Sequence, residues 1–506
     1  MSNLARSVWL VALAKLVIHL ATSAQGYGYF GDELYYIAGT DRLDWGYVDH
    51  PPFSIALLSL WQAAFGESLV ALRMLAALFG AAAVVAAGVL AGELGGRTRA
   101  QLLTAIVVAL APVNLVVHGF YSMNAIDVLV WELAFIVLAR LIRSPTPALW
   151  IAFGGLLGIG LQNKYSVAWF GIGLLVALLA TPHRRLLRTP GPWIAGAVAA
   201  LLFAPHVLWQ ISLGFPSLEF MQAATTTKMV PVGPIDLFAQ QALVMNPVAL
   251  PIWLAGFVLL LRGDPRGPDR MFALIFVVTA AILIANGTSR PNYLALAQPP
   301  LIAAGAIGIE RLGRRERWRW LPTTAIASVA IVGLTMSPLT LPVLAPETLA
   351  RLSQQVGIGA PKMENRELGA LDPHFADMIG WELIAAAVAE VYDGLPPDER
   401  ARAIIIGRNY SETGAIELYG RARGLPVPAS PHNSYWHWGP GTQDGSVVVL
   451  AGGTLERWQE HWADVRAVGS WDCGLCLPGR NHQTIFVARE PRAPIDEIWR
   501  ALRRYN

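Results

Sequence analysis

The chain begins with the apolar run "VWLVALAKLVIHLATSA" (residues 8–24), which leads into the stretch "GYFGDELYYIAGTDRLDWGYVDHPP" (residues 28–52). We interpret the first run as a retained membrane span, because no clear small-residue cleavage site follows it. The second stretch cannot span a membrane, since glycines, aromatic residues and carboxylates dominate it. Connectors as long as this one are usually functional. The sequence therefore predicts that the loop over residues 26–68 builds a site.

The composition excludes an ordinary soluble protein. Of the 506 residues, 54% are hydrophobic and 14% are charged, and the mean hydropathy is +0.45. Soluble domains carry about 25% charged residues. The basic residues form short clusters between apolar runs and no long basic face, so we expect no nucleic-acid partner. The composition indicates a polytopic α-helical membrane protein.

Apolar windows suited to about 30 Å of hydrocarbon recur eleven times in the first two thirds of the chain. They fall near residues 8–25, 69–93, 101–118, 124–142, 147–162, 165–181, 192–212, 244–262, 271–286, 293–310 and 321–342. The windows 147–162 and 271–286 are short, and we expect them to be tilted or partly re-entrant.

Arginine clusters set the expected orientation of these spans. Clusters such as "HRRLLR" and "RLGRRERWRW" fall in alternate connectors, which the positive-inside rule assigns to the cytoplasm. The loop 26–68 and everything after residue 343 then lie on the opposite side. The sequence thus predicts a transmembrane domain over residues 1–342 and an extracytoplasmic domain over residues 343–506.

The composition after residue 343 is that of a globular domain. The segments "RAIIIGRNY" and "GSVVVLAGG" are typical of buried strands, and "SETGAIELYGRARG" between them is typical of a helix. We therefore expect an α/β domain. The spacing of its histidines, His432, His437 and His482, fits no strong metal-binding motif.

Three acidic residues are candidates for base chemistry. Asp32 and Glu33 are adjacent, so on a helix their side chains diverge by about 100° and only one can face a reaction. The other could cap the helix, pair with Arg42 or bind a cation; a solvated acidic face is the alternative for both. Asp127 lies one turn inside a span, where an ionisable residue is costly unless it faces a cavity or partner. We expect Asp32 and Asp127 to share one outer cavity.

Two cations lie at the expected depth of lipid headgroups. Lys164 lies between two spans in "LGIGLQNKYSVAWF", and Arg290 lies in "NGTSRPNYLALAQPP". Such a pair can bind a phosphate and stabilise the charge that it gains on leaving. Snorkelling of either side chain to lipid headgroups is the alternative.

These motifs resemble the polyprenyl-phosphate-sugar-dependent membrane glycosyltransferases of the GT-C fold. The pattern is similar to the bacterial branch of the protein O-mannosyltransferase family, family 39, whose relatives include the lipid A aminoarabinose transferases. The matching pieces cover nearly the whole chain and are, in order, "GDELYY", "DHPPFSIALLSLW", "NAIDVLVWE", "GLQNKYS", "SRPNYLALAQPPLIAAGA", "NYSETGAIELYG" and "HNSYWHWGP".

The resemblance implies roles for the acidic residues. Asp32 matches the aspartate that acts as catalytic base or orients the acceptor, Glu33 completes the acidic pair, and Asp127 matches a second acidic position. Asp49 stands where some relatives help to hold a divalent metal. No clear set of partner ligands accompanies Asp49 in the sequence, so the resemblance leaves a metal cofactor undecided.

The resemblance also implies a donor-phosphate site. It would comprise Lys164 and Arg290, with His50 at a position where relatives often carry lysine. Because histidine titrates near neutrality, this exchange weakens a phosphate role for His50. Acceptor-side or supporting positions are expected at Asp49, Tyr35 and Tyr293.

The function implied by the resemblance is inverting transfer of a hexose or pentose from a polyprenyl (undecaprenyl or decaprenyl) phosphate to an extracytoplasmic acceptor. The acceptor would be a protein, lipid A or an envelope glycan. The implied location is the bacterial cytoplasmic membrane, with the active site facing the periplasm. A transporter or flippase of a lipid-linked sugar is the alternative, although the sequence shows none of the inverted repeats typical of transporters. A receptor-like binding module is a third hypothesis.

The only two cysteines, Cys473 and Cys476, form a C-x-x-C motif in the expected outer domain. On the oxidising side of the membrane, two such thiols are expected to form a disulfide. Redox catalysis is disfavoured because glycines and a proline around them indicate a turn. Zinc would need two more ligands, and only His482 is near in sequence. We therefore expect a structural disulfide before the strand "TIFVARE".

Overall fold

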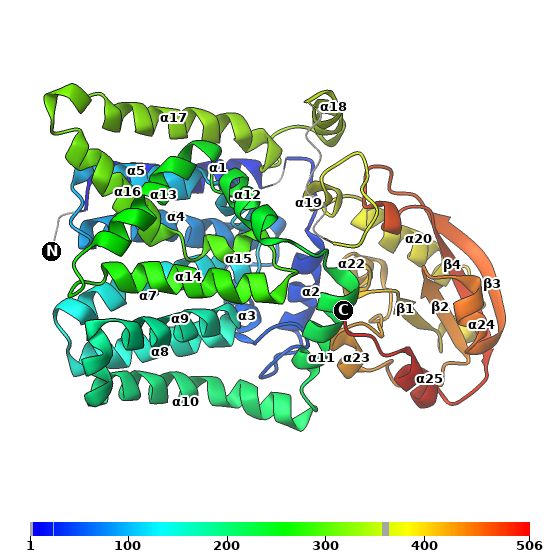
Figure 1. Cartoon of the computed structure of the whole chain (residues 1–506). Helices are drawn as coiled ribbons and strands as arrows, with labels where there is room; N and C mark the ends of the chain where they lie inside the picture. The colour runs from blue at the N-terminus through cyan, green and yellow to red at the C-terminus, as the bar shows by residue number, and fades with distance from the viewer. Residues whose placement is uncertain (1–3, 24, 357–363) are drawn as a thin grey trace.

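The computed structural model describes residues 4–23, 25–356 and 364–506. Figure 1 shows a bundle of roughly aligned helices at one end of the molecule and a β-sheet with short helices at the other. The principal bundle helices are α1 (Arg6–Thr22), α4 (Leu69–Glu93), α5 (Thr98–Leu110), α7 (Met123–Arg143), α8 (Pro147–Asn163), α9 (Ser166–Ala180), α10 (Pro190–Ser212), α13 (Leu250–Arg262), α14 (Asp269–Asn286), α16 (Pro299–Leu312) and α17 (Leu321–Met336).

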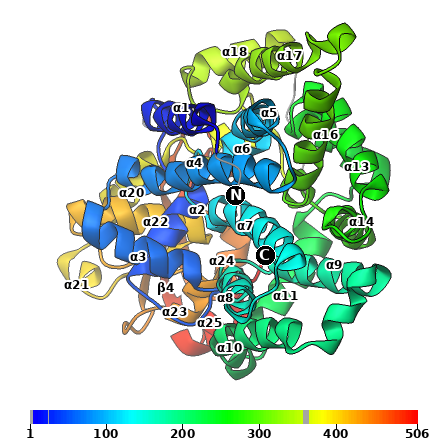
Figure 2. The same ribbon diagram turned by 90° about the vertical axis from the view of Figure 1, so that its left-hand side faces the viewer.

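Each of the eleven apolar windows contains one of these helices. Within the described residues, four helices are long and apolar enough to cross a membrane on their own, and the number is six if two bent helix pairs each form one span. The predicted count of eleven spans therefore stays a prediction. Figure 2, viewed along the bundle, shows α4 near its centre, where it packs against α1, α5 and α7.

The structure breaks two windows that the sequence presents as continuous and bends the chain at the start of a third, the window 244–262. The window 101–118 is interrupted after Leu110, and α6 (Pro112–Val117) begins at a proline, whose missing N–H suits a helix start. A bend of 109° separates α12 (Pro234–Val244) from the pair η3 (Pro247–Ala249) and α13. The window 293–310 starts with the separate α15 (Pro291–Ala295). Prolines thus divide apolar runs that composition alone cannot divide.

The acidic loop over residues 26–68 contains two helices, α2 (Gly31–Thr40) and α3 (Phe53–Phe65). The Glu33 carboxylate accepts a hydrogen bond from the Phe30 N–H at 2.8 Å, which satisfies one free amide at the start of α2. The other connecting elements are η1 (Pro182–Arg188), α11 (Pro216–Ala223), η2 (Ala224–Lys228), η4 (Glu316–Trp318), η5 (Ser337–Leu339) and α18 (Pro346–Val356).

The sheet in the C-terminal part has the order β1-β2-β4-β3, from β1 (Ile404–Gly407), β2 (Val447–Ala451), β3 (Trp462–Trp471) and β4 (Gln483–Pro491). The strands β1 and β2 are parallel and fully buried, and they coincide with the two strands expected from the sequence. β4 pairs antiparallel with β2 and β3. The accompanying helices are α19 (Pro373–Ala376), α20 (Trp381–Asp393), α21 (Pro397–Arg400), α22 (Tyr410–Gly420), η6 (Arg421–Arg423), α23 (Ser434–Trp438), α24 (Leu455–Gln459), η7 (Pro478–Arg480) and α25 (Ile495–Leu502).

Helix α22 of the C-terminal part packs closely against α2 (Figure 1). A Cβ atom on Gly31 would lie 2.7 Å from Asp377 Oδ2 and 2.9 Å from Ser411 Oγ. A Cβ atom on Gly414 would lie 3.0 Å from the backbone of Leu34. The two glycines therefore permit an approach that larger residues would prevent, and they fix α22 beside the helix that carries Asp32.

Candidate active site at the junction of the two parts

Asp32 lies in the first turn of α2, at the junction between the bundle and the C-terminal part. Its Oδ1 accepts a hydrogen bond from the Tyr410 hydroxyl at 2.9 Å, and its side chain is partly accessible. Burial raises the pKa of the Asp32 carboxyl; the charge of Asp377 acts in the same direction, and the Lys228 ammonium opposes both. A carboxylate with a raised pKa and an accessible oxygen has the properties of a general base.

Glu33, adjacent to Asp32, lies in a different environment. It is completely buried, and besides the Phe30 N–H it accepts hydrogen bonds from the Tyr121 N–H at 2.9 Å and from Arg73 Nη2 at 3.1 Å. Both carboxylate oxygens therefore have protein partners. This geometry favours a structural role for Glu33, as helix cap and ion-pair partner, over the predicted catalytic one.

Arg42, which the sequence offered as a partner for this acidic pair, binds elsewhere. It forms an ion pair with Glu417 of α22 at 2.8 Å, and its guanidinium lies 4.6 Å from the ring centroid of Trp438. Arg42 thus links the acidic loop to the C-terminal part.

The Lys164 ammonium forms an ion pair with Asp127, with a distance of 3.3 Å from Nζ to Oδ2. Lys164 also donates to Asn124 Oδ1 at 2.7 Å and lies 4.7 Å from the ring centroid of Tyr293. The Ser166 hydroxyl lies 2.7 Å from both Asp127 oxygens. The acid and the cation that the sequence assigned to different parts of the site therefore form one buried unit.

Asp127 and Lys164 line a small cavity of about 20 Å³, which has room for about one water molecule. Asn124, Glu132 and Asn292 also line it. Asp32 is not among the residues that line this cavity, so the shared outer cavity of Asp32 and Asp127 stays a prediction.

Arg290 forms an ion pair with Glu364, which also pairs with Arg366 at 2.8 Å. Burial alone would raise the pKa of Glu364, but the charges of Arg290, Lys228 and Arg366 hold it below its ordinary value. The next residue, Asn365, donates its backbone N–H to the Lys228 carbonyl at 2.7 Å. The segment after residue 363 thus brings a carboxylate to the predicted phosphate-binding arginine.

The remaining predicted positions lie in an aromatic cluster. The Tyr35 hydroxyl donates to Asp49 Oδ1 at 3.0 Å, and its ring centroid lies 4.7 Å from that of Tyr410. His50 is buried, its Nδ1 lies 2.8 Å from the Pro51 carbonyl, and its ring stacks on another aromatic ring. This packing does not support a phosphate contact for His50.

The predicted metal position at Asp49 gains no ligand set in the structure. Over residues 4–23, 25–356 and 364–506, no group of three or more His, Cys, Asp and Glu side chains is arranged to hold a metal ion. The one side-chain partner of the Asp49 carboxylate in this region is the hydroxyl of Tyr35. The residues around Asp49 therefore do not fit a divalent metal in this arrangement.

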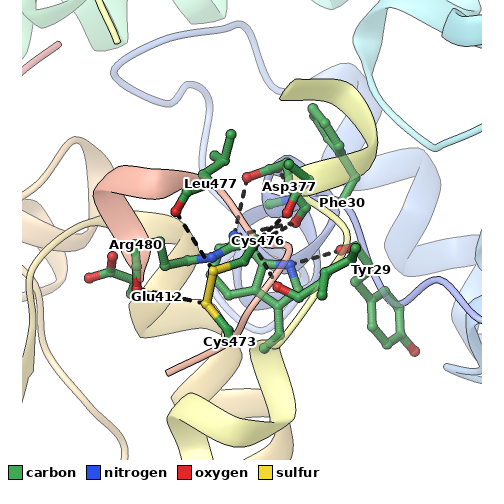
Figure 3. Close-up of polar contacts among 12 residues, drawn as sticks. Tyr29, Phe30, Asp377, Glu412, Cys473, Cys476, Leu477 and Arg480 are labelled. Carbon is green, nitrogen blue, oxygen red and sulfur yellow. Dashed lines mark hydrogen bonds and ion pairs between the residues drawn. A yellow bond between two sulfur atoms is a disulfide. The ribbon is translucent and has the colours of Figure 1, made fainter. Parts of the chain in front are cut away.

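A buried network in the C-terminal part supports the start of α2 (Figure 3). Asp377 Oδ2 accepts a hydrogen bond from the Gly31 N–H at 2.7 Å, and Asp377 Oδ1 accepts one from Arg480 Nη1 at 3.2 Å. Arg480 also donates to the Ile379 carbonyl at 2.6 Å, and its guanidinium lies 3.6 Å from the ring centroid of Trp381. Arg480 thus holds the carboxylate that caps α2.

The turn that precedes Arg480 contains Cys473 and Cys476, which form a disulfide in the structure (Figure 3). The Cys473 N–H donates to the Asn481 side chain at 2.7 Å, and the Trp471 indole donates to the Arg480 carbonyl at 2.9 Å. The disulfide therefore closes the turn that positions Arg480.

Sequence reasoning missed Tyr410, Asp377 and Glu364 as members of this site. Tyr410 belongs to "NYSETGAIELYG", where its place directly after a buried strand was the available signal. Asp377 and Glu364 lie in irregular segments whose contacts with α2 and Arg290 depend on the tertiary fold. No local pattern marks them.

A family model described as dolichyl-phosphate-mannose-protein mannosyltransferase matches residues 49–209. The structure is similar to the crystal structure of ArnT from Cupriavidus metallidurans bound to undecaprenyl phosphate. The alignment covers 95% of this chain and 97% of the ArnT chain, with 13% sequence identity and a TM-score of 0.63. The apo structure of the same ArnT has the same coverage, with 14% identity and a TM-score of 0.61. No curated protein sequence matches the chain significantly.

The chain has the fold of ArnT, and together with the mannosyltransferase family match this fits a GT-C membrane fold. The resemblance to the protein O-mannosyltransferase family, which the sequence motifs predicted, is confirmed. At 13% identity the ArnT structure shows the common fold.

Proposed function

We propose that the protein is an inverting glycosyltransferase that moves a sugar from a polyprenyl phosphate to an acceptor on the outer side of the bacterial cytoplasmic membrane. The mannosyltransferase family match and the fold shared with ArnT, which binds undecaprenyl phosphate, support this proposal. The observation that carries it is the position of Asp32. A partly accessible carboxylate with a raised pKa lies within the electrostatic influence of Lys228 and Arg290.

Asp32 is the base in this mechanism. It takes the proton of the acceptor hydroxyl while the hydroxyl oxygen forms a bond to the anomeric carbon on the face opposite the phosphate. The bond from the anomeric carbon to the phosphate oxygen breaks, and its electron pair stays on the polyprenyl phosphate. A phosphate is a good leaving group, so cations that stabilise its added charge matter more than a general acid.

Lys164 and Arg290 are the proposed cations. Each is paired with a carboxylate, Asp127 and Glu364 respectively. Lys164 and Tyr293 are in contact, and Tyr293 lies on α15, which begins directly after Arg290. Tyr293 therefore links the two cations. A donor phosphate that binds between Lys164 and Arg290 would compete with Asp127 and Glu364 for these cations.

A conversion assay in detergent tests the proposal and separates it from the flippase hypothesis. Purified protein is incubated with the total lipids and the envelope fraction of cells that lack the gene, and polyprenyl-phosphate sugars and free polyprenyl phosphate are measured by mass spectrometry. Because detergent micelles offer no second leaflet, conversion of donor to polyprenyl phosphate reports chemistry. We expect conversion with the wild type and none with Asp32→Asn. Full donor recovery with the wild type would reject the glycosyltransferase.

A further inference from the structure

We infer that Tyr410, a residue of the C-terminal part, is a positioning residue for the transfer reaction: its hydroxyl holds the Asp32 carboxylate in the orientation that receives the acceptor proton. This inference rests on the proposed role of Asp32 as base. The C-terminal part would then contribute a side chain to the active site. Neither the family match nor the sequence motifs assign such a role to this part of the chain.

The first observation is the contact between the two side chains. The Tyr410 hydroxyl donates to Asp32 Oδ1 at 2.9 Å, across a sequence separation of 378 residues. Among the described residues, no other group donates a hydrogen bond to the Asp32 carboxylate. Since the side chain is partly accessible, Oδ2 is free to accept a proton while Oδ1 is held.

The second observation is that Tyr410 itself is held from several sides. Its backbone N–H donates to His432 Nδ1 at 3.3 Å, and its ring stacks on the His432 ring with centroids 5.0 Å apart. The ring of Tyr410 also packs against the ring of Tyr35, with centroids 4.7 Å apart. Tyr410 is also the first residue of α22, whose cap is the Asn409 side chain bound to the Glu412 N–H at 2.9 Å. The position of the hydroxyl is therefore fixed before substrate binds.

The third observation is the close seating of α22 on α2. Ser411 faces Gly31, the residue directly before Asp32, and Gly414 faces Leu34. Tyr410 and Asp32 thus project from two helices whose separation is set by glycine contacts. Preorganised groups of this kind lower the cost of reaching a reactive geometry.

The charges around Asp32 decide the expected pH effect. Asp377 and Asp49 disfavour its ionised form, while Lys228 and the Tyr410 hydrogen bond favour it. Asp32 also acts on Arg290, which lies directly before α15, and on Tyr36 of its own helix α2. Loss of the hydroxyl alone removes one group that favours the carboxylate and leaves the others in place. The acidic limb of the rate profile should then move to higher pH.

The test compares the purified wild type with Tyr410→Phe and Tyr392→Phe in the conversion assay across a pH series. With Tyr410→Phe we expect the acidic limb to move up by about one pH unit, which is a tenfold lower rate on that limb, with recovery at higher pH. The KM for the lipid donor should stay within about twofold, because the Tyr410 hydroxyl donates its hydrogen bond to Asp32 and not to a partner of Lys164 or Arg290. Tyr392→Phe is the matched control, since it removes a tyrosine hydroxyl that binds the Arg400 carbonyl within the C-terminal part.

A second substitution keeps the test decisive if Tyr410→Phe unfolds in a thermal melt. Tyr410→3-fluorotyrosine keeps the ring and makes the hydroxyl a stronger donor, so the limb should move to lower pH. An unchanged limb in both Tyr410 variants, with inactive Asp32→Asn, would overturn the inference and leave the proposed function intact. Wild-type turnover by Asp32→Asn would instead reject the base on which the inference rests.

Discussion

Lys164 and Asp127 form a buried ion pair, with 3.3 Å between Nζ and Oδ2, inside the helical bundle. Asp127 is wholly buried and Lys164 is 7% exposed. The sequence assigned Asp127 to the acceptor side of the site and Lys164 to the donor side. In the structure the two side chains form one ion pair. Asp127 therefore acts first as the group that holds the Lys164 side chain in place.

Asp127→Asn should destabilise the protein by about 3 kcal/mol, because it leaves a buried ammonium without its counter-charge. The double variant Asp127→Asn with Lys164→Met should unfold at a higher temperature than Asp127→Asn alone. Thermal unfolding in detergent measures both. Equal unfolding temperatures for Asp127→Asn and the wild type would show that the pair contributes no net stability.

Glu33→Gln should lower stability rather than remove a catalytic group. The substitution takes the charge from a completely buried partner of Arg73, and breaking such a pair costs about 3 kcal/mol. We expect a lower unfolding temperature and a near-normal rate per folded molecule. Glu67→Gln, at an exposed position of the same loop, is the control. A stable but inactive Glu33→Gln protein would restore Glu33 as a catalytic residue.

The rate of transfer should fall in acid through a pKa above the ordinary aspartate value of about 3.9. Asp32 must be ionised to act as a base, and burial together with Asp377 raises its pKa. The rate is therefore full above the raised pKa and is lost as the pH falls through it. A turnover profile measured on pre-formed donor complex checks this. A rate that stays constant down to about pH 4 would exclude Asp32 as the titrating base.

Thiol labelling of the native, unreduced protein should find neither Cys473 nor Cys476 free, because the two form a disulfide in the turn before Arg480. Replacing both by serine should lower the unfolding temperature modestly, since the closed loop is short. Quantitative labelling of both cysteines would reject the disulfide and call the proposed outer location of this domain into question.

The helices and the two central strands could be predicted because their signal is local. Each apolar window holds a helix, and "RAIIIGRNY" contains β1. The breaks inside the windows needed the structure, since a proline such as Pro112 starts a new helix only if the backbone turns there. Composition alone does not determine that turn.

The sequence could single out the charged residues of the candidate site, but it could not predict which side chains they contact. Asp32, Lys164 and Arg290 stand out in sequence as charges where a membrane protein usually has few. Their partners do not stand out, because Tyr410 is 378 residues from Asp32 and Glu364 lies in an irregular segment. Contacts at such separation depend on the tertiary fold, and no local periodicity encodes them.

The most direct test of Asp32 as the base of a sugar transfer is mass spectrometry of envelope lipids, glycans and proteins. Three strains are compared, carrying the wild-type gene, no gene, or Asp32→Asn at equal membrane abundance. We predict a product with one added sugar in the wild type alone, and accumulated polyprenyl-phosphate sugar in the other two. The same product at wild-type level in the Asp32→Asn strain would contradict the account.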